Sequence, residues 1–231
     1  MEIAKLRIVS RSYGLLHDRR EAGQLLSREL RDLRGQKAVV LGIPRGGVVV
    51  AHELARALEA DLDIVLAHKM RTPGHPELAL GAVAEGGNLF LNQRIVQELS
   101  IQSSYIERER VYQEAQLAHR ASLIRRVLPK IPLEGRLVVV TDDGVATGAT
   151  AQAALWAARH ENPKKLIVAM PVGSEEAVTR LAEDADEVVC LRVPPGFTAV
   201  GQFYVRFDEV SDDDVLAILE EERLRRGDGK P

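Results

Sequence analysis

Short apolar runs alternate with amphipathic stretches over most of the chain. Five runs have the length of buried strands, and they cover residues 38–43, 63–67, 137–141, 166–172 and 187–191. Apolar residues recur at helical spacing between these runs, which predicts helices over 18–33, 48–58, 150–160 and 175–184. Continuous apolar strands that alternate with helices are typical of a parallel sheet covered on both faces. We therefore predict an α/β fold with a parallel-sheet core and helices on both of its faces.

The middle of the chain follows a different pattern. GAVAE (81–85) and LFL (89–91) predict a short antiparallel pair of strands that turns at two consecutive glycines. Residues 93–127 predict two helices separated near Ser100, and the second helix is rich in charges of both signs. We expect this segment to be a mainly helical insertion, a hood or lid, on the α/β core.

The insertion divides the predicted core into residues 1–92 and 128–231. The second part ends in a helix expected over 212–226, whose acidic start and basic end complement the helix dipole. The charged helix over 102–127 allows several interpretations: a solvated face, a lid, a contact between the copies of a homodimer, or an RNA-binding face.

Composition limits the class of protein. The chain has 231 residues, a net charge of -3 and 45% hydrophobic residues, which suits one α/β domain with an insertion. This charge argues against nucleic acid as a partner, and no apolar stretch approaches the roughly 20 residues that span a membrane. The single cysteine, Cys190, excludes an internal disulfide and a multi-cysteine metal site. The N-terminus lacks the apolar core of a secretory signal, so we expect a soluble, cytoplasmic protein.

The strongest chemical signal is LVVVTDDGVATGAT, residues 137–150. Gly148 allows the backbone to approach a ligand closely, and a helix that begins near Ala149 favours an anion at its N-terminus. The hydroxyls of Thr147 and Thr150 can donate hydrogen bonds to phosphate oxygens. Together these residues predict a phosphate-binding loop.

Two acids precede this loop. Asp142 and Asp143 stand at the carboxyl end of the predicted strand, where open α/β sheets place ligands. Adjacent carboxylates can accept hydrogen bonds from two neighbouring hydroxyls of a sugar. The alternative is a tight turn whose acids are merely solvated, but it leaves the coincidence of small residues, hydroxyls and acids unexplained. A ligand that carries both a phosphate and a sugar fits the whole motif.

This motif resembles the 5-phosphoribosyl 1-pyrophosphate (PRPP) binding motif of the type I phosphoribosyltransferases, in which an apolar strand and two acids precede a loop ending Thr-Gly-x-Thr. The resemblance covers the spacing of the core strands over about residues 37–192. GIPRGG (42–47) stands where the family has a pyrophosphate-binding loop, and HKMRTPGHPELAL (68–80) stands where it has a flexible catalytic loop. Together with a late AVGQFY, these segments resemble a poorly characterised bacterial subgroup of the family.

The resemblance implies a reaction and its site. A nitrogenous, nucleobase-like acceptor would displace pyrophosphate from PRPP with the help of Mg²⁺, as in nucleotide metabolism. Mg²⁺ would be held mainly through oxygens of PRPP and water, so no metal ligand is expected among the side chains. The implied residues are Asp142 and Asp143 for the ribose hydroxyls, Ala146, Thr147, Gly148, Ala149 and Thr150 for the 5′-phosphate, Arg45, Gly46 and Gly47 for pyrophosphate, and Lys69 and Arg71 as further catalytic cations.

The acceptor side is less sharply defined. PPGFTAVGQFYVRF (194–207) follows the last core strand, where relatives stack their base, and it contains Phe197, Phe203 and Tyr204. In a chain with 4% aromatic residues this concentration predicts a flat wall for the acceptor, with stacking worth about 1–3 kcal/mol. A loop anchored by buried aromatic rings is the equal alternative. No pattern specifies a purine, a pyrimidine or orotate.

Two other functions would use the same pocket. One is a regulator that senses PRPP and binds RNA, DNA or protein without catalysis, as some family members do. The other is an enzyme that hydrolyses PRPP or phosphorolyses a nucleotide. The acid pair and the cations Lys69 and Arg71 favour the transferase, although His68 stands where many relatives have arginine. The oligomeric state stays open.

Overall fold

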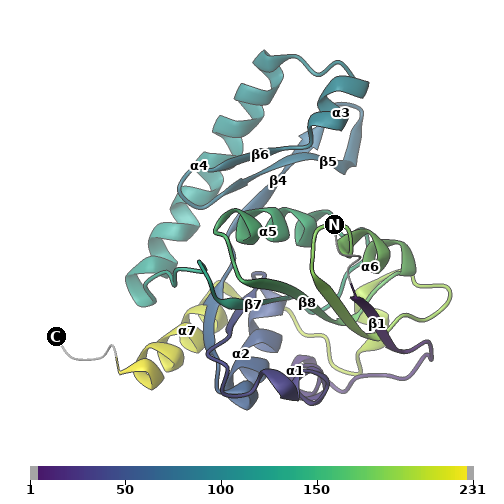
Figure 1. The fold of residues 1–231 in the computed structure, drawn as a ribbon, viewed down its shortest axis with the longest axis vertical. Helices are drawn as coiled ribbons and strands as arrows, with labels where there is room; N and C mark the ends of the chain where they lie inside the picture. Colours follow the sequence, from purple (N-terminus) through teal and green to yellow (C-terminus); the bar gives the residue numbers. More distant parts are fainter. Residues whose placement is uncertain (1–4, 228–231) are drawn as a thin grey trace.

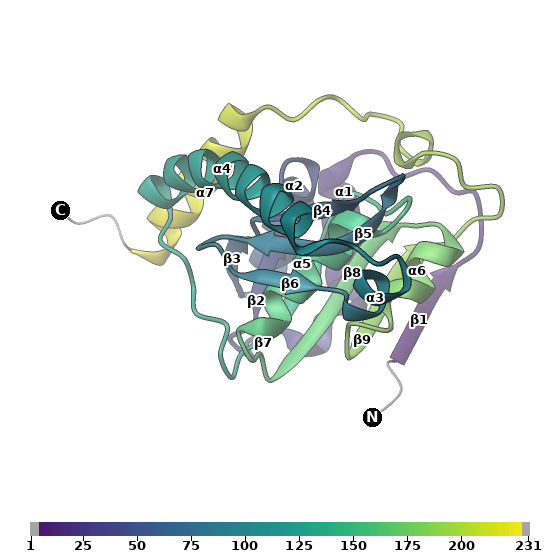
Figure 2. The same ribbon diagram turned by 90° about the horizontal axis from the view of Figure 1, so that it is seen from above.

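Six parallel strands form the main sheet of the computed structural model, which describes residues 5–227 and the side chains of all of these except 76 and 77. Their order across the sheet is β1-β9-β8-β7-β2-β3. Figure 1 shows the sheet between its helices, and Figure 2 labels all of its strands. The bounds are Lys5–Ser10 (β1), Val39–Gly42 (β2), Asp61–Ile64 (β3), Leu137–Thr141 (β7), Lys165–Val172 (β8) and Glu187–Arg192 (β9). The predicted parallel-sheet α/β fold is confirmed.

Helices cover both faces of this sheet, as the continuous apolar strands predict (Figure 1). On β7, Val138 and Val140 belong to one hydrophobic cluster with Leu155, whereas Val139 points to a second cluster on the other face. This alternation explains why the strand is apolar throughout. The first face carries α5 (Ala149–His160) and α6 (Glu175–Leu181), and the second carries α1 (Arg19–Glu29) and α2 (Gly46–Leu58).

A smaller antiparallel sheet stands above α5 (Figure 1). It consists of β4 (Ala67–Thr72), β5 (His75–Ala84) and β6 (Leu89–Leu91). The predicted pairing of GAVAE with LFL is confirmed, because Ala82 pairs with Phe90 in the β5–β6 ladder. Most of the segment 68–80, which the resemblance assigns to a flexible catalytic loop, forms the β4–β5 hairpin, and its flexibility and catalytic role stay predictions. Pro73 and Gly74 form the turn of this hairpin, where Gly74 has a φ of 75°, and β5 is buried continuously from Ala79 to Ala84.

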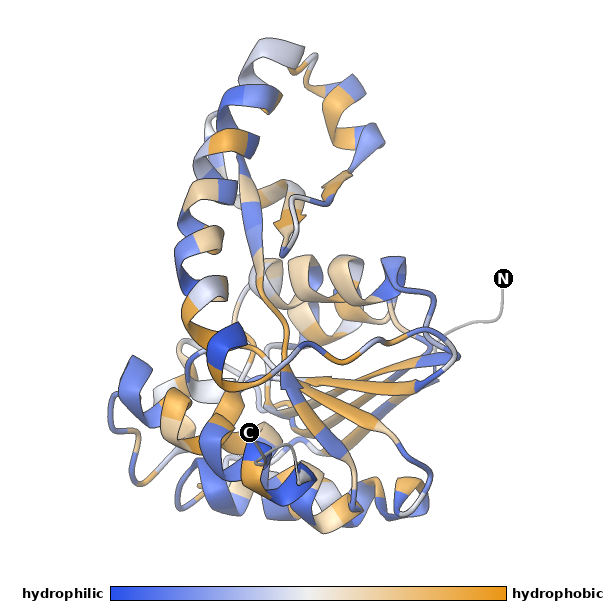
Figure 3. Cartoon of the chain, turned by 90° about the vertical axis from the view of Figure 1, so that its left-hand side faces the viewer, coloured by the Kyte–Doolittle hydropathy of each residue, from blue (hydrophilic) through white to orange (hydrophobic). Residues whose placement is uncertain are grey.

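Two helices follow the small sheet, as predicted, and they are α3 (Gln93–Glu98) and α4 (Ser103–Val127). The chain turns between them at Ser100, whose φ of 48° lies in the left-handed region. Figure 3 shows α4 as a long upright helix beside the core. The division of the chain into a core and an insertion at 93–127 stays a prediction.

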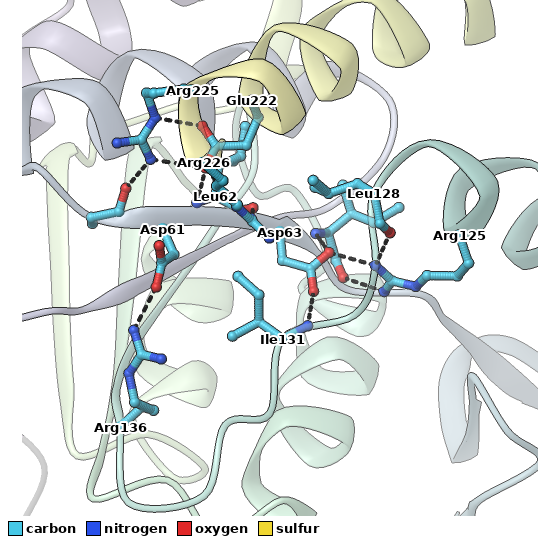
Figure 4. Close-up of polar contacts among 12 residues, drawn as sticks. Asp61, Leu62, Asp63, Arg125, Leu128, Ile131, Arg136, Glu222, Arg225 and Arg226 are labelled. Atoms are coloured by element: carbon cyan, nitrogen blue, oxygen red, sulfur yellow. Dashed lines mark hydrogen bonds and ion pairs between the residues drawn. The ribbon is translucent and has the colours of Figure 1, made fainter. Parts of the chain in front are cut away.

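The last helix, α7 (Asp212–Arg226), covers the exposed edge of β3 with polar side chains (Figure 4). Glu222 accepts a hydrogen bond from the backbone N–H of Leu62 at 3.2 Å, and Arg226 donates to the carbonyl of the same residue. Glu222 is only 1% exposed and also pairs with Arg225 and Arg226. Edge strands present unpaired backbone groups, and here the side chains of α7 bind the backbone groups of Leu62 that a neighbouring strand would otherwise pair with.

The charged helix α4 is anchored by two of its arginines. Arg125 pairs with the buried Asp63 at 2.6 Å and with Glu85 at 2.7 Å, as Figure 4 shows for Asp63. Arg120 pairs with Asp212 at the start of α7. The helix therefore carries structural ion pairs as well as a solvated face. Within residues 5–227, no helix combines the length and the apolar character that crossing a bilayer requires.

Candidate functional site

The acid pair and the glycine loop after β2 lie against each other. Strands β2 and β7 are neighbours, with Gly42 opposite Thr141, so the loops that follow them leave the sheet side by side. A Cβ atom built on Gly46 would lie 1.9 Å from Oδ2 of Asp143. One built on Gly47 would lie 2.7 Å from Cα of Asp142. The structure therefore brings together the two predicted binding elements, and only glycines permit this approach.

The predicted phosphate loop turns into α5 at Gly148. This residue has a φ of 82°, which favours glycine, and it precedes the first helical residue, Ala149. The first N–H groups of a helix have no partner within the helix and carry partial positive charge. Arg180 donates to the carbonyl of Thr147 at 3.1 Å, and Ser174 donates to that of Ala146 at 2.7 Å. These bonds fix the loop while Ala146, Thr147 and Thr150 stay exposed.

An arginine that the sequence analysis did not select completes the acid pair. Arg19, the first residue of α1, donates from Nε to Oδ2 of Asp143 at 2.8 Å. Its Nη1 donates to the carbonyl of Asp208 at 2.7 Å, and its guanidinium lies 3.9 Å from the ring centroid of Phe207. Arg19 is 124 residues from Asp143 in the sequence, so no local motif indicates this contact.

Burial raises the pKa of both acids, and repulsion between the carboxylates adds to this effect at Asp142. Desolvation raises the pKa of Asp142 well above its usual range, and the negative charge of Asp143 raises it further. Desolvation also raises the pKa of Asp143, against the opposing effect of the Arg19 guanidinium. Shifts of this kind concentrate at functional sites because binding groups are held away from water.

The predicted pyrophosphate loop carries one cation, Arg45, whose side chain forms an ion pair with Glu209. Its Nη2 lies 2.8 Å from Oε1 of Glu209, in a pair whose side chains are 38% and 81% exposed. The Pro44–Arg45 peptide bond is cis. Arg45 therefore stands next to the glycines that contact the acid pair, and a bound anion would compete with Glu209 for it.

The two predicted catalytic cations on β4 differ in their surroundings. Arg71 donates from Nε to Glu109 on α4 at 3.1 Å, and its guanidinium faces the ring of Tyr112. The structure therefore places Arg71 against α4 and not against the acid pair. Lys69 alternates along the strand with His68, which contacts Gln113 on α4. Neighbouring strand residues point to opposite faces, so Lys69 lies on the face of β4 away from α4, as does Ala67, which packs against the cluster that contains α5. The ladder is irregular between Met70 and Arg71, and this returns Arg71 to the α4 side.

The β5 end of the hairpin lies near the predicted phosphate loop. A groove between β5 and α3 on one side and α5 and α6 on the other is lined by Leu78, Ala79, Ala149, Gln152 and Arg180, among others. Part of the segment that the resemblance assigns to catalysis thus borders the N-terminus of α5.

The aromatic residues after β9 are mostly part of the core. Phe203 is 1% exposed and Tyr204 is 6% exposed, which favours the anchored-loop alternative for both. Phe197 is half-buried and stacks on Phe203 with 5.3 Å between ring centroids. The Tyr204 hydroxyl donates to the carbonyl of Asp143 at 2.6 Å. This bond ties the C-terminal segment directly to the acid pair, and Phe207 is 37% exposed beside it.

Comparison with known proteins shows which family the chain resembles. The family described as the phosphoribosyl transferase domain matches residues 13–208. A protein of Mycobacterium tuberculosis H37Rv, provisionally named a phosphoribosyl transferase, is 45% identical over 206 residues, which are 89% of this chain and 46% of that protein. The chain thus spans about half the length of the curated relatives it matches. The crystal structure of TT1426 from Thermus thermophilus shares 52% identity, with a TM-score of 0.85, over 90% of this chain and 98% of that one.

Proposed function

Because this chain belongs to the phosphoribosyl transferase domain family, we propose that it transfers ribose 5-phosphate from PRPP to a nitrogenous, nucleobase-like acceptor and releases pyrophosphate. The observation that carries the proposal is the contact of Gly46 and Gly47 with Asp143 and Asp142. This contact brings the two acids that we assign to the ribose directly beside the loop that we assign to pyrophosphate. The exposed phosphate loop follows the acids along the same chain segment.

Each element has a role in the proposed reaction. Asp142 and Asp143 accept hydrogen bonds from the ribose hydroxyls and so fix the sugar ring. The N–H groups at the start of α5 hold the 5′-phosphate, and the hydroxyls of Thr147 and Thr150 add donors. Arg45 and the amides of Gly46 and Gly47 receive the pyrophosphate. These contacts hold PRPP in one orientation, so that its anomeric carbon faces the acceptor nitrogen.

The bond changes follow from this arrangement. A nitrogen lone pair of the acceptor forms a bond to the anomeric carbon of PRPP, and the bond from that carbon to pyrophosphate breaks. Pyrophosphate leaves with the bonding electrons, and the acceptor nitrogen loses its proton. Positive charge develops on the ribose in the transition state, and the acid pair stabilises it electrostatically. Water would compete with the acceptor for the same carbon, so the transfer requires that water be kept from it during the reaction.

Mg²⁺ belongs to the same proposal as a companion of PRPP. Among the described side chains, no three acids, histidines or cysteines gather into a metal site. The oxygens of PRPP and water are the hard ligands that Mg²⁺ prefers. Bound there, the ion would neutralise charge on the leaving pyrophosphate. We also assign the reaction to the cytoplasm and to nucleotide metabolism as part of the proposal.

A regulator that binds PRPP without catalysis is the second candidate. The engagement of Arg71 by Glu109 favours it, because a predicted catalytic cation is held away from the acid pair. The ion pair of Arg19 with Asp143 is compatible with the transferase and with the regulator. The two differ in whether pyrophosphate is released.

The acid pair provides the test. In the double variant Asp142→Asn/Asp143→Asn, PRPP turnover should fall by at least about a hundredfold, since both acceptors for the ribose hydroxyls lose their charge. Circular dichroism checks that the variant is folded. The matched control is Asp32→Asn/Asp213→Asn, two exposed acids away from the site, which changes net charge equally and should keep wild-type kinetics. Unchanged kinetics in the Asp142/Asp143 variant would remove the ribose role of the pair.

A further inference from the structure

Arg19 is held on three sides next to the acid pair. Its side chain is 11% exposed, and that of its partner Asp143 is 16% exposed. Besides the bond to Asp143, it donates to the carbonyl of Asp208 and stacks on Phe207. A guanidinium stays protonated at all accessible pH values. This arrangement therefore fixes one permanent positive charge against one carboxylate.

The acid pair needs such a charge. Asp142 and Asp143 are adjacent, their carboxylates repel each other, and both are desolvated. Without compensation, one of two close carboxylates takes up a proton. A protonated carboxyl is neutral and is therefore a weaker acceptor for the hydrogen bond from a ribose hydroxyl. Arg19 lowers the pKa of both acids and so opposes protonation.

Geometry adds a second effect. A Cβ atom on Gly46 would lie 2.9 Å from Nε of Arg19 and 1.9 Å from Oδ2 of Asp143. The Arg19–Asp143 pair therefore packs directly beneath the pyrophosphate loop. The Nε–Oδ2 bond fixes which oxygen of Asp143 faces that loop, and the carbonyl of Asp208 prevents the guanidinium from rotating away.

We propose that Arg19 is a positioning residue for the ribose of PRPP: its guanidinium holds the Asp143 carboxylate ionised and in a fixed orientation, so that both acids can accept the sugar hydroxyls. The inference rests on the proposed function. It also gives the C-terminal segment a part in the site, because Asp208 and Phe207 hold Arg19 in place.

Arg19 is the cation in direct contact with Asp143, because the other ionisable groups described nearby are neutral or paired elsewhere. The Tyr204 hydroxyl donates to the backbone of Asp143, and burial raises its pKa, so that it stays neutral. Arg45 is paired with Glu209. The titratable and charged groups that face the Asp143 region are Asp142 from its own loop, Arg19 from α1, Arg45 from the loop after β2, Arg192 at the end of β9, and Tyr204, Asp208 and Glu209 from the C-terminal segment.

The direct test needs no substrate. Protein labelled with ¹³C at the aspartate carboxyls is titrated by NMR, with the Asp142 and Asp143 signals assigned from single asparagine variants. In Arg19→Gln the titration midpoints of the pair should move to higher pH, because the stabilising positive charge is gone. Arg19→Lys, which keeps the charge, should lie between this variant and the wild type. If Arg19→Gln does not fold, the titration midpoints of Arg19→Lys are compared with those of the wild type instead.

The control is Arg20→Gln, one residue further along α1. Arg20 is 65% exposed and pairs with Glu53, so the same loss of charge should leave the midpoints unchanged. Midpoints in Arg19→Gln and Arg19→Lys equal to those of the wild type would overturn the inference, whatever the enzyme does with PRPP.

The second readout is the pH dependence of kcat/KM for PRPP. Its acidic limb should shift to higher pH in Arg19→Gln, so the loss is larger at pH 6 than at pH 8. Adding Arg19→Gln to Asp143→Asn should cost little more than Asp143→Asn alone, within about twofold, because both act through one carboxylate. A loss that is equal at every pH and fully additive would instead indicate direct contact with pyrophosphate, and would refute the positioning role. Absence of PRPP binding in the wild type would refute the proposed function separately.

Discussion

Replacing Gly46 by alanine should damage the site far more than the fold. Gly46 is the first residue of α2, and its φ lies outside the left-handed region. Alanine is favoured over glycine in helices by up to about 1 kcal/mol. The helix itself therefore tolerates the change, and the damage comes from what the new methyl group meets.

The magnitude follows from the contact at this position. The added Cβ would lie 1.9 Å from Oδ2 of Asp143, while ordinary contact begins at 3.4 Å. The carboxylate must therefore move by about 1.5 Å, and this movement breaks its bond to Arg19 at 2.8 Å. A misplacement of about 1 Å at a reacting centre can cost a hundredfold in rate. We expect kcat/KM for PRPP to fall by about a hundredfold in Gly46→Ala.

The assay is pyrophosphate release at a series of PRPP concentrations, with circular dichroism at the assay temperature as a check of folding. Gly14→Ala is the matched control: its φ is also outside the left-handed region, and its new Cβ would lie 3.4 Å from the nearest atom, in the side chain of Arg192. This control should keep wild-type kinetics. Activity of Gly46→Ala within about threefold of the wild type would refute the reasoning, because the required displacement would then be harmless.

Three further changes test other parts of the account. Gly148→Val places a branched side chain at a φ of 82° in the phosphate loop, with about 1–3 kcal/mol of local strain, and PRPP binding should fall below detection in calorimetry. Glu222→Ala leaves the buried Leu62 N–H without its acceptor and should lower the free energy of unfolding in urea by about 3–5 kcal/mol. Glu209→Gln releases Arg45 from an exposed pair worth about 0.2–1 kcal/mol, and should lower KM for PRPP by the corresponding factor of about 1.4 to 5.

Each of these has a control and a contrary outcome. Gly135→Val places valine at a similar φ of 69°, at a position where an added Cβ has no neighbour within 4 Å, so this variant should keep PRPP binding. An affinity of Gly148→Val for PRPP equal to that of the wild type would contradict the phosphate-loop assignment. Glu220→Ala removes an exposed partner of Arg223 on the same helix and should cost under about 1 kcal/mol; an equal cost for Glu222→Ala would contradict the edge-strand role. Glu59→Gln frees Arg34 in another exposed pair and should leave KM unchanged, and a raised KM in Glu209→Gln would show that Glu209 supports binding.

Much of the fold could be predicted because its core strands are apolar on both faces. LVVVT coincides with β7, and the helix expected over 212–226 coincides with α7. Strand β1 was missed because KLRIVS mixes charged and apolar residues, as suits an edge strand that is only partly buried. The strand expected over 63–67 lies at 61–64, since Asp61 conceals its start. Asp63 is buried because Arg125 neutralises it, and that partner is remote in sequence.

The candidate site was predictable where it is local in sequence. Asp142, Asp143 and the glycines after β2 could be selected because each stands at the end of an apolar strand. Arg19 could not be selected, because its role depends on a contact across 124 residues. The burial of Phe203 and Tyr204 was equally hidden, since an aromatic residue suits a ligand wall and a core alike.

Pyrophosphate release from PRPP with Mg²⁺ tests the central claim most directly, in a screen of nucleobases and related heterocycles with a control that has no acceptor. The account predicts release that depends on one acceptor and is lost in Asp142→Asn/Asp143→Asn. Release without any acceptor would indicate hydrolysis. Tight PRPP binding with no release under any condition would contradict the transferase and favour the regulator.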